Sequence, residues 1–256
     1  MAKKTPLAEK LEEVRTRIAT VCAKAKRDPS DVTLIAVTKT AAPEQIREII
    51  QLGVADLGES RVQVLQQKVA QINEFHQRRV QSADVNVAGR LRWHMIGHLQ
   101  RNKIKPVLPL VAYIHSVDSL RLAEEIDVAA EKMGLKVQVL LQVNTAEEQQ
   151  KYGVAVGAAL HLAEQMDTMP GVQIVGLMAM APFDAAEPVV RQIFARTREL
   201  FEELKWQKIG GVHFKHLSMG MSNDFEAAIL EGSTMVRIGS SLFGSKSDES
   251  AEDEEH

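Results

Sequence analysis

Short apolar segments with strand-like composition recur along the whole chain, and segments with the apolar spacing of helices lie between them. The first strand-like segment, 33–38, is bounded by polar residues and rich in β-branched and aliphatic side chains. Seven more segments share this character. The predicted strands are 33–38, 55–58, 93–97, 113–117, 137–144, 174–180, 214–218 and 235–239.

The intervening segments carry apolar residues on one helical face. In the first of them, 6–27, that face includes Cys22, which we therefore expect to be a buried structural thiol. Asp118 and Gly134 are expected to cap one helix, and Asn223 and Gly232 another. The further predicted helices are one that starts at Pro43 and ends before Gly53, and 60–80, 99–106, 119–133, 154–168, 187–205 and 223–231.

Eight strands that alternate with helices predict an α/β fold, and specifically a single (β/α)8 TIM-type barrel. The chain has 256 residues, enough for one such barrel. A doubly wound open sheet is the alternative, but the glycine-rich G-x-G-x-x-G fingerprint does not follow the first strand. We expect residues 1–244 to form the barrel domain.

Charge and hydropathy narrow the classes of function. The last residues, 245–256, contain six acidic residues and one lysine, which predicts a disordered acidic tail. Residues 76–92 are interpreted as a polar, solvated insertion. The rest of the chain has no strong basic excess, so we expect no nucleic-acid partner. The chain also lacks an apolar run long enough for a membrane span or a signal peptide, which favours a cytoplasmic protein without a membrane partner.

Polar residues at strand ends are the candidates for function, because a barrel carries its site at the C-terminal ends of its strands. Lys39 follows the first strand and shares a face with Ile35 and Val37. We expect this lysine to be partly buried, which would lower its pKa and favour the neutral, nucleophilic amine. The alternative is a lysine that extends from the strand end into solvent.

The last strand supplies a cation and a turn. Arg237 alternates with Met235 and Gly239 and so faces the same way as they do. A buried arginine needs a partner, which would be Glu59, Glu231 or a ligand. Gly239, Ser240 and Ser241 form a turn suited to a phosphate. An amine, a cation and a phosphate turn together indicate a site for pyridoxal 5′-phosphate (PLP), whose pyridine nitrogen would be the ligand atom open to Arg237.

The chain resembles the PLP homeostasis protein family, single-domain relatives of the alanine racemase barrel. The resemblance covers about residues 7–244 and rests on ordered motifs rather than on a single match. These motifs are Leu34–Lys39, Gly58–Glu59, Trp93–Gly97, Leu99–Lys103, Gln142–Asn144, Gly176–Met178, Leu217–Ser222 and Glu231–Gly239.

The resemblance implies a barrel of PLP fold type III without the C-terminal β domain of the racemases. It implies that Lys39 holds PLP as a Schiff base and that Arg237 meets the pyridine nitrogen. We also expect the phosphate to be held by Ser218, Met219, Gly239 and Ser240. Ser60, which stands where the family usually has asparagine, and His94 complete the expected cofactor contacts.

The resemblance further implies a carrier that buffers and delivers PLP, without catalytic turnover. Apo forms of PLP-dependent enzymes are the expected protein partners, and a monomer is the expected state. The alternative is a catalytic PLP enzyme such as an amino-acid racemase, which needs an acid or base on each face of the substrate. In the racemases a tyrosine from a second domain serves one face, whereas Tyr113 and Tyr152 here both belong to the barrel portion.

Overall fold

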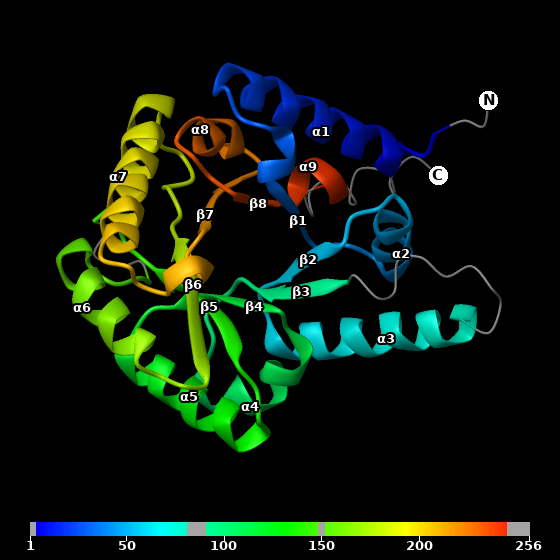
Figure 1. Cartoon of the computed structure of the whole chain (residues 1–256). Coiled ribbons are helices and arrows are strands. Elements are labelled where there is room, and N and C mark those ends of the chain that lie inside the picture. The colour runs from blue at the N-terminus through cyan, green and yellow to red at the C-terminus, as the bar shows by residue number, and fades with distance from the viewer. Residues whose placement is uncertain (1–3, 81–90, 148–151, 245–256) are drawn as a thin grey trace.

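The computed structural model describes residues 4–80, 91–147 and 152–244. Its centre is a closed barrel of parallel strands in chain order, in which β8 pairs with β1 (Figure 1). The strands are β1 (Thr33–Val37), β2 (Asp56–Glu59), β3 (Arg92–Met95), β4 (Tyr113–Val117), β5 (Val137–Gln142), β6 (Val172–Met178), β7 (His216–Met221) and β8 (Met235–Ile238). The predicted (β/α)8 barrel is therefore confirmed, and the open doubly wound sheet is excluded.

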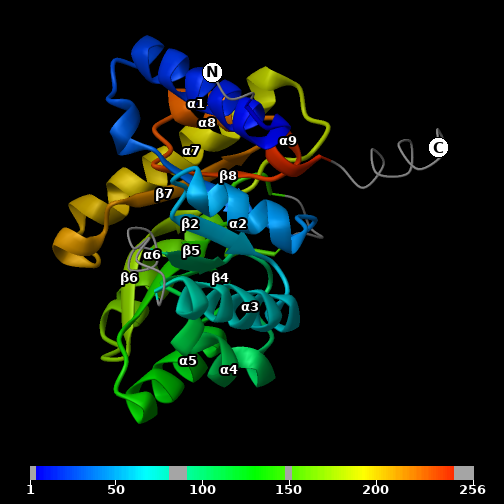
Figure 2. The same ribbon diagram turned by 90° about the vertical axis from the view of Figure 1, so that its right-hand side faces the viewer.

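Helices surround the barrel, with α1 and α5 on opposite sides of the strands (Figure 2). Helix α1 packs against α8 and α9, close to the strands at which the barrel closes. The α-helices are α1 (Pro6–Lys24), α2 (Pro43–Gln51), α3 (Val62–Val80), α4 (Ile104–Val107), α5 (Leu120–Met133), α6 (Val156–Asp167), α7 (Glu187–Trp206), α8 (Phe225–Leu230) and α9 (Ser240–Phe243). None of the helices in the described part of the chain is long and apolar enough to cross a membrane.

The hydrophobic core has two parts, because alternate residues of each strand face the helices and the barrel interior. The larger part lies between strands and helices and includes Leu57, Met95 and the buried Cys22, as predicted for that thiol. The smaller part lies inside the barrel and includes Ile35, on the predicted inward face of β1. Its buried members are Ile35, Tyr113, Leu140, Val175, Met178 and Met235.

Several element ends differ from the predictions for local reasons. Ser119, not Asp118, caps α5, since its hydroxyl accepts a hydrogen bond from the Leu122 N–H at 3.4 Å. Asp224, not Asn223, precedes α8, while Gly134 ends α5 as predicted. The helix expected at 99–106 is divided into a short 3-10 turn, Arg101–Lys103, and α4, because Pro106 permits only a short helical stretch.

The polar insertion expected at 76–92 is helical in its first part, because α3 continues to Val80. Residues 81–90 lie outside the described residues, and Arg92 already belongs to β3. The acidic tail at 245–256 also lies outside the described residues. Its predicted disorder therefore stays a prediction, as does the division of the chain at residue 244.

Candidate functional site

The two ends of the barrel domain meet where β1 pairs with β8. In this parallel register Ile35 lies beside Arg237, and Ala36 beside Ile238. The next pair brings Val37 and Gly239 together: a Cβ placed on Gly239 would lie 3.4 Å from the Val37 Cβ. Lys39 follows two residues after Val37, so it lies at the same C-terminal edge as Arg237 and Gly239. The structure thus brings together three of the predicted site residues.

Lys39 is exposed, and the prediction that it is partly buried is wrong. Strand β1 ends at Val37, so Lys39 lies in the turn beyond it rather than on the strand. Among the described residues it has no hydrogen-bond or ion-pair partner. Its amine is therefore open to a ligand at the barrel mouth.

A buried ion pair holds the turn that carries Lys39. The Glu59 carboxylate, 1% exposed, lies 2.9 Å from the Lys68 ammonium of α3. Glu59 also accepts a hydrogen bond from the Thr38 hydroxyl at 3.2 Å, and Lys68 donates to the Thr38 carbonyl. The residue before Lys39 is thus fixed from two sides, while Lys39 itself is not.

Arg237 is a buried cation, 4% exposed, whose partners are neutral oxygens. It donates to the Ser218 hydroxyl at 2.6 Å and to the Ser218 carbonyl at 2.9 Å. A third hydrogen bond goes to the Ala179 carbonyl at 3.1 Å. Burial lowers the pKa of Arg237 to about 10, so the guanidinium stays charged at neutral pH.

Neither carboxylate considered as a partner of Arg237 is available to it. Glu59 pairs with Lys68, and Glu231 pairs with Arg191 at 2.6 Å and Arg198 at 2.7 Å. Within the described residues Arg237 has no ion pair with any carboxylate, although the nearby negative charge of Asp224 partly opposes the effect of burial on its pKa. Two of its five N–H donors are also unused there. A buried cation of this kind fits a ligand that accepts a hydrogen bond.

Ser218 belongs to a buried chain of hydrogen bonds that crosses the barrel interior. Its hydroxyl lies 3.0 Å from Nδ1 of His115, and Nε2 of His115 lies 2.9 Å from Nδ1 of His94. Nε2 of His94 in turn lies 2.9 Å from Oδ1 of Asp56. Both ring nitrogens of His94 therefore have protein partners, and direct contact between His94 and a cofactor stays a prediction.

Burial and hydrogen bonding set the charge states of the residues in this hydrogen-bonded series. Burial lowers the pKa of His94 despite the nearby carboxylate, and it lowers the pKa of His115 well below the ordinary value. Burial alone would raise the pKa of Asp56, but hydrogen bonds from His94 and Arg92 outweigh it and the pKa is lowered. The hydrogen-bonded series thus joins two neutral histidines, His115 and His94, to the ionised carboxylate of Asp56 at neutral pH.

The backbone N–H groups of the turn predicted to bind phosphate already donate to a side chain of the protein. The Ser222 hydroxyl oxygen lies 3.2 Å from the Gly239 N–H and 3.4 Å from the Ser241 N–H. Ser240 is exposed beside them. These amides and hydroxyls are the donor types that a phosphate needs, so the donor set at this mouth, together with the Lys39 amine and the Arg237 guanidinium, fits PLP.

The other predicted contacts already have hydrogen-bond partners within the protein. The Met219 N–H already donates to the Ser233 hydroxyl at 3.4 Å, and the Met219 side chain is fully buried. The Ser218 hydroxyl is engaged by His115 and Arg237. The Ser60 N–H donates to Glu59 at 2.8 Å, and its hydroxyl lies 3.5 Å from the same oxygen. Their roles as cofactor contacts stay predictions.

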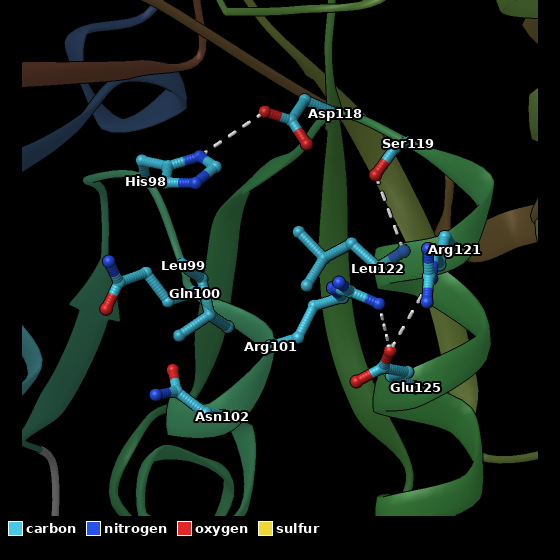
Figure 3. Close-up of a pocket in the computed structure, with 10 residues that line it drawn as sticks. All are labelled: His98, Leu99, Gln100, Arg101, Asn102, Asp118, Ser119, Arg121, Leu122 and Glu125. Carbon is cyan, nitrogen blue, oxygen red and sulfur yellow. Dashed lines mark hydrogen bonds and ion pairs between the residues drawn. The ribbon is translucent and has the colours of Figure 1, made fainter.

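A separate cavity of about 720 Å³ lies beyond β3 and β4, and none of the predicted site residues lines it. In Figure 3 the residues after β3 face the start of α5 across it. His98 lies 3.5 Å from Asp118, and Arg101 pairs with Glu125 at 2.9 Å. The charged groups that line this cavity are largely paired with one another.

Three residues of the site were missed by sequence reasoning. Asp56 lies in the predicted strand 55–58, two residues before Gly58, so strand alternation could have placed it on the same face as Gly58. His115 lies within a predicted strand, but its partners come from other strands. Ser222 closes a motif that supported the resemblance, and its contact with Gly239 depends on the pairing of β7 with β8.

Comparison with known proteins supports the same assignment. Residues 4–247 match the family described as alanine racemase, N-terminal domain. A PLP homeostasis protein of Aquifex aeolicus is 39% identical over 238 residues, which cover 93% of this chain and 97% of that protein.

Two solved structures resemble the fold over nearly their whole length. One, from Bifidobacterium adolescentis and described as an unknown protein, has a TM-score of 0.82 and 36% identity, covering 93% of this chain and 94% of the other. The second is PipY of Synechococcus elongatus with PLP bound, which has a TM-score of 0.73 and 32% identity, covering 93% of this chain and all of PipY. The chain therefore belongs to the alanine racemase N-terminal domain family and, within it, to the PLP homeostasis proteins.

Proposed function

We propose that this protein binds PLP at the mouth formed by β1 and β8 and acts in PLP homeostasis as a buffer and donor of the cofactor. The observation that carries the proposal is that an exposed amine, Lys39, follows β1 at the same barrel edge as a buried cation, Arg237, on the adjacent strand β8. The PLP-bound structure of PipY supports it, because this chain covers all of PipY at 32% identity.

Each group at the mouth has a proposed task. Lys39 would hold the cofactor by condensing with its aldehyde, with loss of water, since it is a primary amine open to a ligand at this mouth. Arg237 donates to the pyridine nitrogen and, as a permanent donor, keeps a proton off it. The hydroxyls of Ser222 and Ser240 would hold the phosphate, together with the N–H groups of Gly239 and Ser241, which would turn from the Ser222 oxygen to the ligand. When bound, PLP supplies an electrophilic aldehyde that exchanges between amines.

We further propose that the protein carries PLP without catalytic turnover. A racemase needs a second acid or base opposite the lysine. Tyr113 is buried inside the barrel and stacks on His94 at 4.8 Å, whereas Tyr152 stacks on His98 at 4.3 Å beside the separate cavity. Both described tyrosines thus have other surroundings. Exposure of Lys39 suits transfer of PLP to another amine, including the lysine of an apo-enzyme.

The remaining parts of the proposal concern the state of the protein. We propose a monomeric, cytoplasmic protein with one PLP-binding domain, 1–244, and an acidic tail, 245–256. Sedimentation of the purified chain with and without residues 245–256 tests the monomeric state and the independence of the domain from the tail. A single species at the monomer mass with unchanged PLP uptake is expected for each, and a dimer or a loss of PLP on truncation would contradict them.

The decisive test compares the purified protein with Lys39→Ala. Added PLP should give the protein a visible absorption band, and borohydride should fix the cofactor on the peptide that contains Lys39. The variant should lack this adduct. A protein that takes up no PLP would refute the proposal. Rapid interconversion of L- and D-alanine by the loaded protein would instead support the racemase alternative.

A further inference from the structure

The hydrogen-bonded chain inside the barrel connects Arg237 with a carboxylate far from it in the network. The order is Arg237, Ser218, His115, His94, Asp56, and consecutive polar atoms lie 2.6, 3.0, 2.9 and 2.9 Å apart. The three middle residues are fully buried, and the two ends are 4% and 6% exposed. Five side chains from five strands, β2, β3, β4, β7 and β8, therefore form one polar path through the barrel interior.

The two ends of the path fix the position of every proton along it. Ionised Asp56 only accepts, so Nε2 of His94 must donate to it. Nδ1 of a neutral His94 then accepts, which requires Nε2 of His115 to donate. Nδ1 of His115 accepts in turn, and the Ser218 hydroxyl donates to it.

Arg237, which only donates, completes the path at the Ser218 oxygen. This pattern satisfies every hydrogen-bonding group along the path while keeping both histidines neutral. The groups around the two histidines explain why they stay so. Burial is the main reason at both positions, and the nearby cations, Arg237 for His115 and Arg92 for His94, further oppose an imidazolium. At His94 these effects outweigh the attraction of the Asp56 carboxylate.

We propose that Ser218, His115 and His94 are positioning residues that link Arg237 to Asp56 as its remote counter-ion and so hold the guanidinium toward the barrel mouth. A series of aligned hydrogen bonds in a low-dielectric interior polarises each member in the same sense. The negative charge of Asp56 thereby adds to that of Asp224 in stabilising the buried guanidinium, and neither carboxylate occupies its N–H groups. The ligand contact itself rests on the proposed binding of PLP.

The path also explains why the buried arginine lacks a directly paired carboxylate. A carboxylate beside Arg237 would take the donors that a ligand needs. A carboxylate at the other end of the path leaves them available. Arg92 completes the arrangement, since its Nε and Nη2 donate to both oxygens of Asp56 at 2.7 Å each and orient that carboxylate.

The first test needs no cofactor. In apoprotein labelled with 15N-histidine and 15N-arginine, His94 and His115 should each show the neutral Nε2–H tautomer at pH 7. The Arg237 Nη groups should rotate slowly and give separate signals. Ser218→Ala should shift the His115 signals and average those of Arg237, whereas Ser218→Thr, which keeps the hydroxyl, should restore both. An Nδ1–H tautomer, an imidazolium, or unchanged Arg237 rotation in Ser218→Ala would overturn the proposal.

The second test measures PLP binding by the same variants. Ser218→Ala should weaken PLP binding by about tenfold or more, because it loosens the charged donor, and Ser218→Thr should recover most of it. Thr197→Val is the matched control: its buried hydroxyl pairs with Thr145 at 2.9 Å, outside the path.

Equal affinity of Ser218→Ala and Thr197→Val would refute the positioning role in binding. If the parent protein itself took up no PLP, the proposed function would fail. The rotation of the Arg237 Nη groups in the apoprotein would still show whether the polar path positions the guanidinium.

Discussion

Glu59 at the end of β2 and Lys68 on α3 form a nearly buried ion pair, 2.9 Å apart, directly beneath the turn that presents Lys39. Both residues also contact Thr38: Glu59 accepts a hydrogen bond from the Thr38 hydroxyl, and Lys68 donates one to the Thr38 carbonyl. The ion pair thus joins β1, β2 and α3 at the barrel mouth, and it places a fixed turn beneath an unfixed lysine.

Removing one member of this pair should be costly. Lys68→Met leaves the Glu59 carboxylate buried without its cation, and we expect the free energy of unfolding to fall by about 3–5 kcal/mol. Urea unfolding followed by circular dichroism measures the change. The double variant Glu59→Gln/Lys68→Met, which removes both charges, should lose less. A double variant no more stable than Lys68→Met would show that charge burial is not the cause.

Gly220 in β7 should tolerate no side chain. Its φ of +89° is unfavourable for other residues, and a Cβ would lie 2.6 Å from the Ala228 Cβ and 2.7 Å from the Phe225 Cα. Strain and overpacking together predict a loss of about 2–4 kcal/mol for Gly220→Ala.

Gly134 is the control for that substitution. Its φ is +64°, but a Cβ there would meet no atom within 4 Å. Gly134→Ala should therefore lose only about 1–2 kcal/mol, from backbone strain alone. Equal losses for the two variants in urea unfolding would mean that α8 moves to accept the methyl group at Gly220.

Stability should fall in mildly acidic solution because of the buried histidines. Burial and the nearby Lys215 lower the pKa of His216 from 6.5 to about 4, and the pKa values of His94 and His115 are lowered as well. Unfolded chains bind these protons first. The stability that neutral histidines provide is complete above about pH 6.5 and is lost as the pH falls toward 4.

Each such histidine adds a slope of at most about 1.4 kcal/mol per pH unit within this window. Urea unfolding at several pH values should therefore show a shallower slope for His216→Gln than for the parent. His161→Gln, which removes an exposed side chain from α6, should keep the parental slope. Identical slopes for the parent and His216→Gln would place the proton uptake elsewhere.

The barrel and the face of each strand could be predicted from the sequence because strand alternation has a fixed period of two. That period grouped Lys39 with Ile35 and Val37 on one face of the first strand, and Arg237 with Met235 and Gly239 on one face of the last strand, about two hundred residues later. Pairing of β1 with β8 then made them neighbours. The predicted burial of Lys39 failed at a single point, since alternation does not determine where β1 ends.

The polar path could not be predicted in the same way. Asp56, His94 and His115 lie on three different strands, and each finds its partners in the path on other strands. Their contacts therefore depend on the stagger between neighbouring strands around the barrel. That stagger follows from the packing of all strands together. Sequence reading also chose Asp118 over Ser119 as a helix cap, because both residue types cap helices and only the backbone conformation distinguishes them.

Cys22 should react slowly with thiol reagents. Its side chain is fully buried on α1, and burial raises the pKa of the thiol, so little thiolate forms near neutral pH. We expect modification by a disulfide reagent at pH 8 to be at least about a hundredfold slower in native protein than in urea. Thr20→Cys in a Cys22→Ala background, exposed on the same helix, should react rapidly. Equal native rates would refute the burial.

Ser222 should act on the phosphate of PLP and not on its ring. Its hydroxyl oxygen accepts from the Gly239 and Ser241 N–H groups, which leaves the hydroxyl hydrogen free to be donated. Ser222→Ala removes this donor and the acceptor that orders the two amides. We expect PLP binding to weaken by about tenfold, as for loss of a hydrogen bond to a charged group.

Pyridoxal, which lacks the phosphate, separates the two explanations for such a loss. If Ser222 serves the phosphate, Ser222→Ala and the parent should bind pyridoxal equally, and inorganic phosphate should compete less well with PLP in the variant. Absorbance titration of both proteins with both ligands measures this difference. Since Lys39 and Arg237 are untouched, equal weakening toward PLP and pyridoxal would mean that Ser222 acts through the fold of the turn, and the phosphate would have to be held by other donors.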